Sequence, residues 1–202
     1  MLNLVYPLFF RPIKILKMSF LFDLKRTSNS LFLTFVALFL SVKILQGQNI
    51  MPDNAMSIVI KSAEFSVNEP RKALEMLKPL KQKFLREGSY ENLEDVAVFS
   101  AIIHAESLTL SLNKRYPQIF RSLNEFQTNI KPLCSNHDDY AIMYFTNKIE
   151  ILAYKTQEKG MSVRGNTRYR GDLKKIMAEV KAFPFKSKLN QSTIIAVIES
   201  YL

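Results

Sequence analysis

The sequence is poor in the residue types on which many small exported proteins and enzymes depend. It has one cysteine, Cys134, so an internal disulfide is excluded and the fold must be held by packing alone. Its two histidines, His104 and His137, are few for a metal site that needs three or four ligands, and we predict none. Only five of the 202 residues are glycine, which agrees with a helical chain.

Short catalytic signatures are also missing. The chain contains no glycine-rich phosphate loop, no G-x-S-x-G, no H-E-x-x-H and no C-x-x-C. We therefore predict a non-catalytic protein without a cofactor. An enzyme of a class that lacks short motifs stays open as an alternative.

A long uncharged run near the N-terminus indicates where the protein goes. Residues 31–42, LFLTFVALFLSV, follow a basic segment with Lys25 and Arg26 and precede Lys43. This is the layout of a secretory signal peptide, and the run falls short of the roughly 20 apolar residues that span a bilayer. We predict a signal peptide at residues 18–48, cleaved after Gly47 or Gln48, and a secreted or periplasmic product. An uncleaved membrane anchor through residues 31–45 is the alternative.

The first seventeen residues fit poorly in front of a signal peptide. They are either the product of a misassigned start codon, with translation beginning at Met18, or an extension of the basic leader. The remaining residues 49–202 have the length of a single domain. Basic residues collect at the end of this domain: residues 49–150 hold 12 basic and 13 acidic residues, whereas residues 151–202 hold 10 and 4.

Apolar residues after Gln48 recur with helical spacing, and no segment alternates with period two. The sequence therefore predicts an all-α fold of about seven amphipathic helices, either stacked as antiparallel hairpins or arranged as an irregular bundle. We expect Pro79 to kink or restart the second helix. The expected helices begin near residues 55, 70, 90, 117, 137, 172 and 191, with N-caps that include Ser89, Asp172 and Asn190 or Ser192.

Two polar clusters have structural explanations. Ser100, His104 and Ser107 fall on the third helix, which is apolar nearly all round and should be the buried centre. We interpret His104 as a buried histidine with a satisfied hydrogen bond, although spacing assigns it no acidic partner. Residues 135–139, SNHDD, resemble a helix N-terminus, with Ser or Asn as cap and two carboxylates in the first turn. Cys134 is predicted to be a small buried residue.

Part of the chain resembles helical hairpin scaffolds of the tetratricopeptide type. Residues 68–77, NEPRKALEML, are similar to the second helix of such a repeat, with Ala73 and Leu77 as packing residues. Helix starts separated by 35 residues are close to the repeat length of about 34. The resemblance covers residues 55–113, and it implies a scaffold that presents a groove to a protein or peptide. It departs from the family pattern in the first helix, where Ser57, Ile60 and Lys61 stand in place of Trp, Leu and Gly.

The strongest functional candidate is a basic segment at residues 161–175, whose first part we predict to be a loop ending at Gly171. Arginine side chains around a tyrosine can clamp a phosphate or a carboxylate. The candidate binding residues are Arg164, Arg168, Tyr169, Arg170, Lys174 and Lys175.

Two functions therefore remain. The first is an exported scaffold for a protein or peptide partner. The alternative is an anion-binding module that recognises an acidic membrane surface through the basic segment, with nucleic acid as a less suitable target after export.

Overall fold

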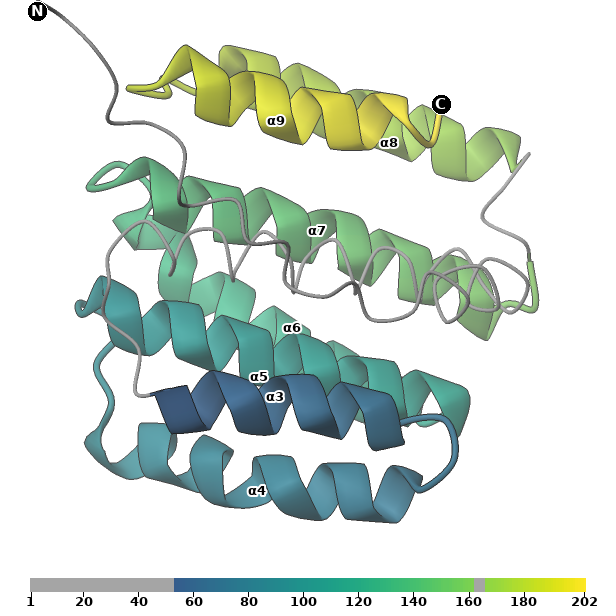
Figure 1. Ribbon diagram of the computed structural model, residues 1–202. Coiled ribbons are helices and arrows are strands. Elements are labelled where there is room, and N and C mark those ends of the chain that lie inside the picture. The colour runs from purple at the N-terminus through teal and green to yellow at the C-terminus, as the bar shows by residue number, and fades with distance from the viewer. Residues whose placement is uncertain (1–52, 162–165) are drawn as a thin grey trace, which may run out of the picture.

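The computed structural model describes residues 53–161 and 166–202 (Figure 1). The predicted signal peptide or anchor, the possible start at Met18 and Arg164 lie outside these residues. The described residues form seven α-helices and no strand, which confirms the all-α prediction. The helices are α3 (Asp53–Phe65), α4 (Pro70–Glu87), α5 (Leu93–Leu112), α6 (Tyr116–Ile130), α7 (Asp138–Glu158), α8 (Thr167–Ala182) and α9 (Lys188–Glu199), with a short 3-10 helix η1 (Lys131–Leu133) after α6.

Successive helices alternate between two layers. Helix α3 packs on α5, α5 on α7 and α7 on α9, so these four form one layer. Helices α4, α6 and α8 each pack between two members of that layer, and in the described part of the chain they make no contact with one another. The helices are stacked from α3 and α4 at one end of the molecule to α8 and α9 at the other (Figure 1). This alternation is the arrangement expected of stacked hairpins.

Several predicted boundaries were wrong. Helix α4 runs without interruption through Pro79, whose exposed position lets water reach the carbonyl that loses its partner. Helix α5 begins at Leu93, because the side chain of Asn92 accepts hydrogen bonds from the first-turn amides, and Ser89 lies outside it. The cap of α7 is His137, and the cap of α9 is Ser187, whose hydroxyl accepts a hydrogen bond from the amide of Asn190.

Helix α5 is the buried centre, as its composition predicts. It contacts α3, α4, α6 and α7. By length and composition it could cross a membrane, but 72% of its most apolar window is buried inside the protein, as in the core helix of a globular domain. Phe99 stacks on Phe84 of α4 with ring centroids 3.8 Å apart, and Phe126 of α6 lies 6.1 Å away from it. Aromatic contacts thus join three successive helices.

Helical spacing predicts one apolar stripe on the first helix that includes Val59, Ile60 and Val67, and only part of it is buried. Ile60 and Val67 are exposed, whereas Ser62 and Ser66 are fully buried. The hydroxyl of Ser66 lies 2.7 Å from that of Thr109 on α5. Each hydroxyl is also within hydrogen-bond distance of the backbone carbonyl four residues before it, at Ser62 and Ala105. A satisfied pair of small hydroxyl groups lets the two helices approach closely, which the apolar spacing alone could not reveal.

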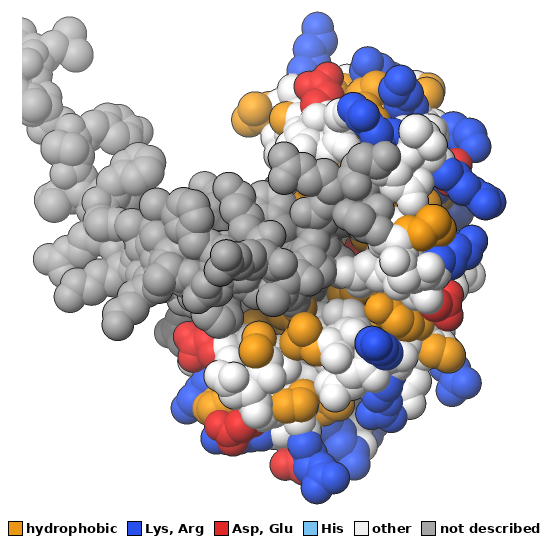
Figure 2. All heavy atoms as spheres, turned by 90° about the vertical axis from the view of Figure 1, so that its right-hand side faces the viewer, with side chains coloured by type: hydrophobic (Ala, Val, Ile, Leu, Met, Phe, Trp, Pro, Cys, Tyr) orange, Lys and Arg blue, Asp and Glu red, His pale blue; other side chains and the backbone are white. Residues whose placement is uncertain are grey.

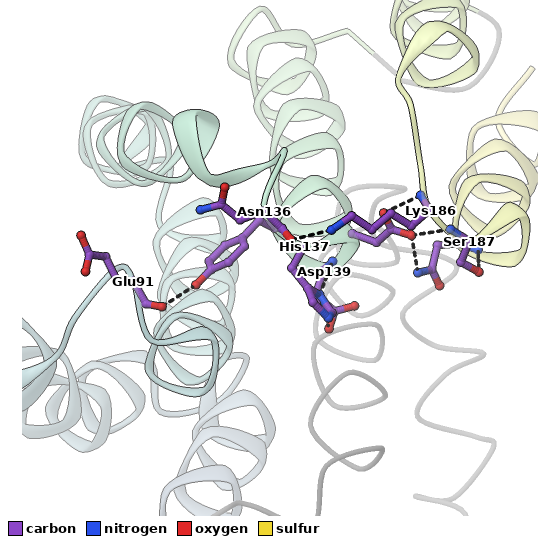
Figure 3. Close-up of polar contacts among 9 residues, drawn as sticks. Glu91, Asn136, His137, Asp139, Lys186 and Ser187 are labelled. Atoms are coloured by element: carbon purple, nitrogen blue, oxygen red, sulfur yellow. Dashed lines mark hydrogen bonds and ion pairs between the residues drawn. The ribbon is translucent and has the colours of Figure 1, made fainter.

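The start of α7 is a polar joint between three parts of the fold (Figure 3). Asp138 is buried, and its carboxylate accepts hydrogen bonds from the amides of Lys186 and Ser187 at 2.9 and 2.8 Å and from the side chain of Asn190 at 3.1 Å. Tyr140 donates to the carbonyl of Glu91, just before α5. The sequence explained Asp138 as a favourable charge in its own helix, but the carboxylate also holds the turn that leads into α9.

This joint makes the stability of the fold depend on pH. Burial by itself raises the pKa of Asp138, but the hydrogen bonds from Lys186, Ser187 and Asn190 outweigh it and hold the pKa below its usual value. A lowered folded-state pKa stabilises the protein above the unfolded pKa of about 3.9, and this contribution is lost as the pH falls through the folded value.

We therefore expect Asp138→Asn to lower the free energy of unfolding by about 2 kcal/mol at pH 7, because one amide oxygen cannot replace a carboxylate with three donors. Urea denaturation at pH 7 and at pH 3 measures the difference, which should shrink at pH 3. The control is Glu199→Gln, which makes the same change in charge at an exposed position near the end of α9. An equal loss at both pH values would contradict the role of the charge.

Candidate functional site

The basic segment is mostly helix rather than loop. Helix α8 begins at Thr167, because the side-chain oxygen of Asn166 accepts a hydrogen bond of 3.0 Å from the amide of Tyr169. Asp172 therefore lies inside the helix and is not its cap. Its carboxylate instead pairs with Lys175 at 2.8 Å, one turn further along.

Helical geometry divides the predicted binding residues into three groups. Successive residues of a helix are turned by about 100°, so Arg168 and Arg170 point in nearly opposite directions. Arg168 lies on the side of Asp172 and Lys175, and Arg170 lies with Lys174 on the other side. All four of these basic side chains are exposed. The described part of α8 therefore does not bring Arg168 and Arg170 to one side, and Arg164 lies outside the described residues.

Tyr169 points inward. It is 1% exposed, and its hydroxyl has no hydrogen-bond partner in the described residues. Burial raises its pKa far above the usual value, so the hydroxyl stays protonated and available as a donor. A buried hydroxyl without a partner costs about 1–3 kcal/mol, which marks this position as unusual.

A pocket of about 100 Å³ lies where the end of α7 meets the start of α8. Of the predicted residues it brings together Arg168 and Tyr169. It also contains three residues that the sequence analysis missed, Lys155 and Thr156 of α7 and Lys159 directly after the end of that helix. Lys155 and Lys159 are four residues apart, which places them on the same side of the chain at the end of α7. Nothing in the sequence shows that this side meets α8.

Lysine and arginine side chains gather around this end of the molecule (Figure 2). The view shows them most densely in the upper part, where α8 and α9 lie. This distribution agrees with the excess of basic residues after position 150. Hydrophobic side chains are scattered over both the upper and the lower part of the same view.

The other candidate surface is the side of the α3–α5–α7–α9 layer that is turned away from α4, α6 and α8, which we name the far face. Phe65 at the end of α3 contacts Lys72 of α4, whose ammonium nitrogen lies 3.8 Å from the ring centroid. Ile60, five residues before Phe65, is turned by about 140° from this contact and therefore points away from α4. Val67 lies two residues after Phe65, in the turn that follows α3, and it is also exposed.

Leu112 of α5 belongs to the same face. Glu106 points toward the other layer, where it binds Lys81 of α4. On α5, Thr109 points toward α3 and His104 points toward α7. Leu112 is turned by about 120° from Glu106, so its side chain points between these two directions. Ile60, Val67 and Leu112 are 39%, 50% and 39% exposed, and within residues 53–161 and 166–202 no helix packs over them.

His104 has an acidic partner inside the core. Its Nδ1 contacts Oε2 of Glu150 on α7, and both side chains are about 1% exposed. This is the buried, hydrogen-bonded histidine that the sequence predicted, with a partner 46 residues away that spacing could not identify. The hydroxyls of Ser100 and Ser107, one turn before and after His104, have no partner in the described residues.

Cys134 is buried, as predicted. Its thiol lies 3.5 Å from the carbonyl oxygen of Ile130. Burial raises its pKa to about 11, so the thiolate is scarce at neutral pH. The thiol therefore serves packing, and it has none of the features of an activated nucleophile.

Comparison of the chain with protein-family models, with curated proteins and with solved structures finds no match. The functional argument therefore depends on the geometry of the two surfaces described above, the far face and the pocket between α7 and α8.

The His104–Glu150 contact leads to a prediction about stability. We expect His104→Leu and Glu150→Leu each to lower the free energy of unfolding by about 3–5 kcal/mol, because each leaves a buried polar partner without its contact. The double variant should recover part of this loss, since two apolar side chains can replace a buried polar pair.

Chemical denaturation of the four proteins gives the coupling energy. Glu158→Leu, which removes an exposed carboxylate from the same helix, serves as the control and should change stability little. Strictly additive losses in the double variant would show that the two side chains do not depend on each other.

Proposed function

We propose that this protein is an exported, non-catalytic scaffold that binds an apolar segment of another protein on its far face. The observation that carries the proposal is the exposure of three apolar side chains on neighbouring elements of one layer: Ile60 on α3, Val67 in the turn after α3 and Leu112 on α5. Exposed apolar residues that lie together, rather than singly, are typical of interaction surfaces.

The geometry of the layer supports this proposal. Stacked hairpins place equivalent sides of successive helices next to one another, so a partner can contact α3 and α5 at once. The seven helices leave the backbone of each element satisfied internally, so affinity must come from side chains. Apolar side chains in the centre of a surface, surrounded by polar ones, are the usual source of binding energy.

The location of the protein is part of the same proposal. The uncharged run at residues 31–42 supports export, by cleavage near Gly47 or by anchoring through residues 31–45. Both routes place residues 53–202 outside the cytoplasm or at a membrane surface, so we expect the partner to be a protein of the same compartment.

The far face can be tested by matched substitutions. We expect Ile60→Glu and Leu112→Glu to weaken partner binding at least tenfold, because each places a carboxylate at the apolar centre of the contact. Leu85→Glu is the control: Leu85 is 58% exposed, but it lies on α4 in the other layer. Since all three positions are exposed, thermal stability should change little.

The measurement is quantitative capture from envelope material, followed by identification of the retained protein and titration of the purified pair. Recovery of monomer alone from the parent protein would count against the scaffold. So would equal binding by the Ile60→Glu and Leu85→Glu variants, because the exposed apolar side chains would then make no contribution.

The leader is tested by N-terminal sequencing of the protein recovered from its cell fraction. Asn49 as the first residue shows cleavage after Gln48, and Gln48 shows cleavage after Gly47. An intact N-terminus at Met18 in membranes would instead establish the anchor. Recovery of an uncleaved chain from the soluble cytoplasmic fraction would overturn both forms of the export proposal.

A further inference from the structure

Side chains in the middle of the far face are buried, although the described helices leave that face uncovered. On α5, Ala101 is turned by about 140° from Glu106, which points toward α4 and α6, and by only about 20° from the exposed Leu112. Ala101 is nevertheless fully buried. Leu108, about 40° from Leu112, is 7% exposed. This stripe of α5 is therefore open at its end and closed in its middle.

Helix α7 shows the same pattern. Asn147 points toward α6, where it donates to a backbone carbonyl, and Lys148 points toward α8, where it pairs with Glu179. Ile142 and Ala153 share one direction on α7, which is turned by about 120–140° from those of Asn147 and Lys148. Both side chains are buried, with Ile142 7% exposed and Ala153 fully enclosed. They lie on the far face, away from the layer of α4, α6 and α8.

The neighbouring helices of the same layer do not cover this side of α7. Glu150 contacts α5, Asp138 binds the start of α9, and their directions on α7 are about 120° apart. Ile142 and Ala153 point between them. Helices α5 and α9 make no contact with each other in the described part of the chain, so they reach only the edges of this side. Burial of its centre therefore requires a segment outside the described helices.

The N-terminal part of the chain contains a segment that fits. Apart from residues 1–52, only residues 162–165 lie outside the description, and these four residues are needed to join α7 to α8. The uncharged run at residues 31–42 has the apolar character that the far face requires. Residues 43–52 connect this run to α3 and can extend over about 35 Å, which exceeds three distances of about 10 Å between packed helices. The run can therefore reach α5 and α7.

Charges at one end of the far face favour the same segment. Helices α3, α5 and α7 begin at the same end of the molecule (Figure 1). At that end Glu94 lies in the same direction on α5 as Leu112, and Asp139 lies on α7 about 40° from Ala153. Lys43, which ends the uncharged run, precedes the start of α3 by ten residues. Its positive charge complements the two acids.

We propose that residues 31–42 cover the far face over α5 and α7 while the leader is attached, and that loss of the leader opens this face to the partner. The inference rests on the proposed scaffold function, and it adds a control of the same site. Exposed apolar surfaces promote unwanted association. A leader that covers the surface prevents this before export, and either cleavage or insertion of the run into a membrane uncovers it.

Photo-cross-linking of the full chain tests this contact directly. Cell-free synthesis without membranes keeps the leader attached, and benzoylphenylalanine replaces Phe35 of the run or, as the control, Phe9 near the N-terminus. We expect the probe at position 35 to form cross-links to α5 and α7 of its own chain. Cross-links to a second copy, or cross-linking from position 35 that is no greater than from position 9, would overturn the proposal.

A matched pair of leader variants measures the covering in a second way. Leu38→Asp places a carboxylate in the uncharged run, and Leu8→Asp makes the same change outside it. Because burial of a carboxylate is unfavourable, we expect Leu38→Asp to uncover the far face and to raise binding of the apolar dye ANS by about threefold. Leu8→Asp should leave dye binding as in the parent, and circular dichroism checks that the helices are retained. Equal dye binding by the two variants would contradict the covering.

Partner binding separates this inference from the scaffold function itself. A covered face binds only in the fraction of molecules whose leader has left it, so Leu38→Asp should bind the captured partner about tenfold more tightly than the parent full chain. Equal binding by these two proteins, together with weaker binding by Ile60→Glu, would overturn the covering and leave the scaffold function intact. Cross-links from position 35 without any captured partner would support the covering and count against the scaffold function.

Discussion

The packing of α5 against four other helices is the constraint on which the rest of the fold depends. The sides of this helix that meet a neighbour are favoured when they are apolar or satisfied, since water cannot reach them. The chain places a polar contact at each neighbour: Thr109 contacts Ser66 just after α3, Glu106 contacts Lys81 of α4 and Ser122 of α6, and His104 contacts Glu150 of α7. Each contact fits only one register of the neighbouring helix. The apolar residues supply the energy of association, and these contacts fix how the helices are aligned.

The same division explains what could be predicted from the sequence. Apolar periodicity identifies the seven helices and the central position of α5, because it depends on residues that are close in the chain. Glu150 as the partner of His104, and the turn before α9 as the partner of Asp138, depend on contacts across 46 residues or more, which periodicity does not encode. The start of α8 was missed for a different reason. Residues 167–171, TRYRG, have weak helical character, and a cap at Asn166 together with burial of Tyr169 outweighs it.

The two candidate surfaces also differ in how far the sequence could indicate them. The basic residues of the pocket were visible as an excess of charge after residue 150, but their grouping depends on the way α7 meets α8. Arg168 was found and joined to Lys159, while Arg170 was separated from both by the turn of the helix. On the far face, Ile60 and Val67 were assigned to the core because their spacing is helical. Spacing shows that residues share a side of a helix, but only packing shows which side is covered.

Both surfaces break a local rule at some cost in stability. Arginines in the first turn of α8 oppose its dipole, a buried Tyr169 hydroxyl lacks a partner, and Ile60 and Val67 expose apolar side chains to water. None of these features improves the packing of the helices, and common substitutions at each position would relieve the cost. In much of the rest of the described fold, local and tertiary preferences agree, as in the capped start of α5 and the satisfied carboxylate of Asp138, although the buried hydroxyls of Ser100 and Ser107 also lack a partner there. On the far face such a departure is expected where another segment completes the interaction, because the cost is then recovered in the bound state.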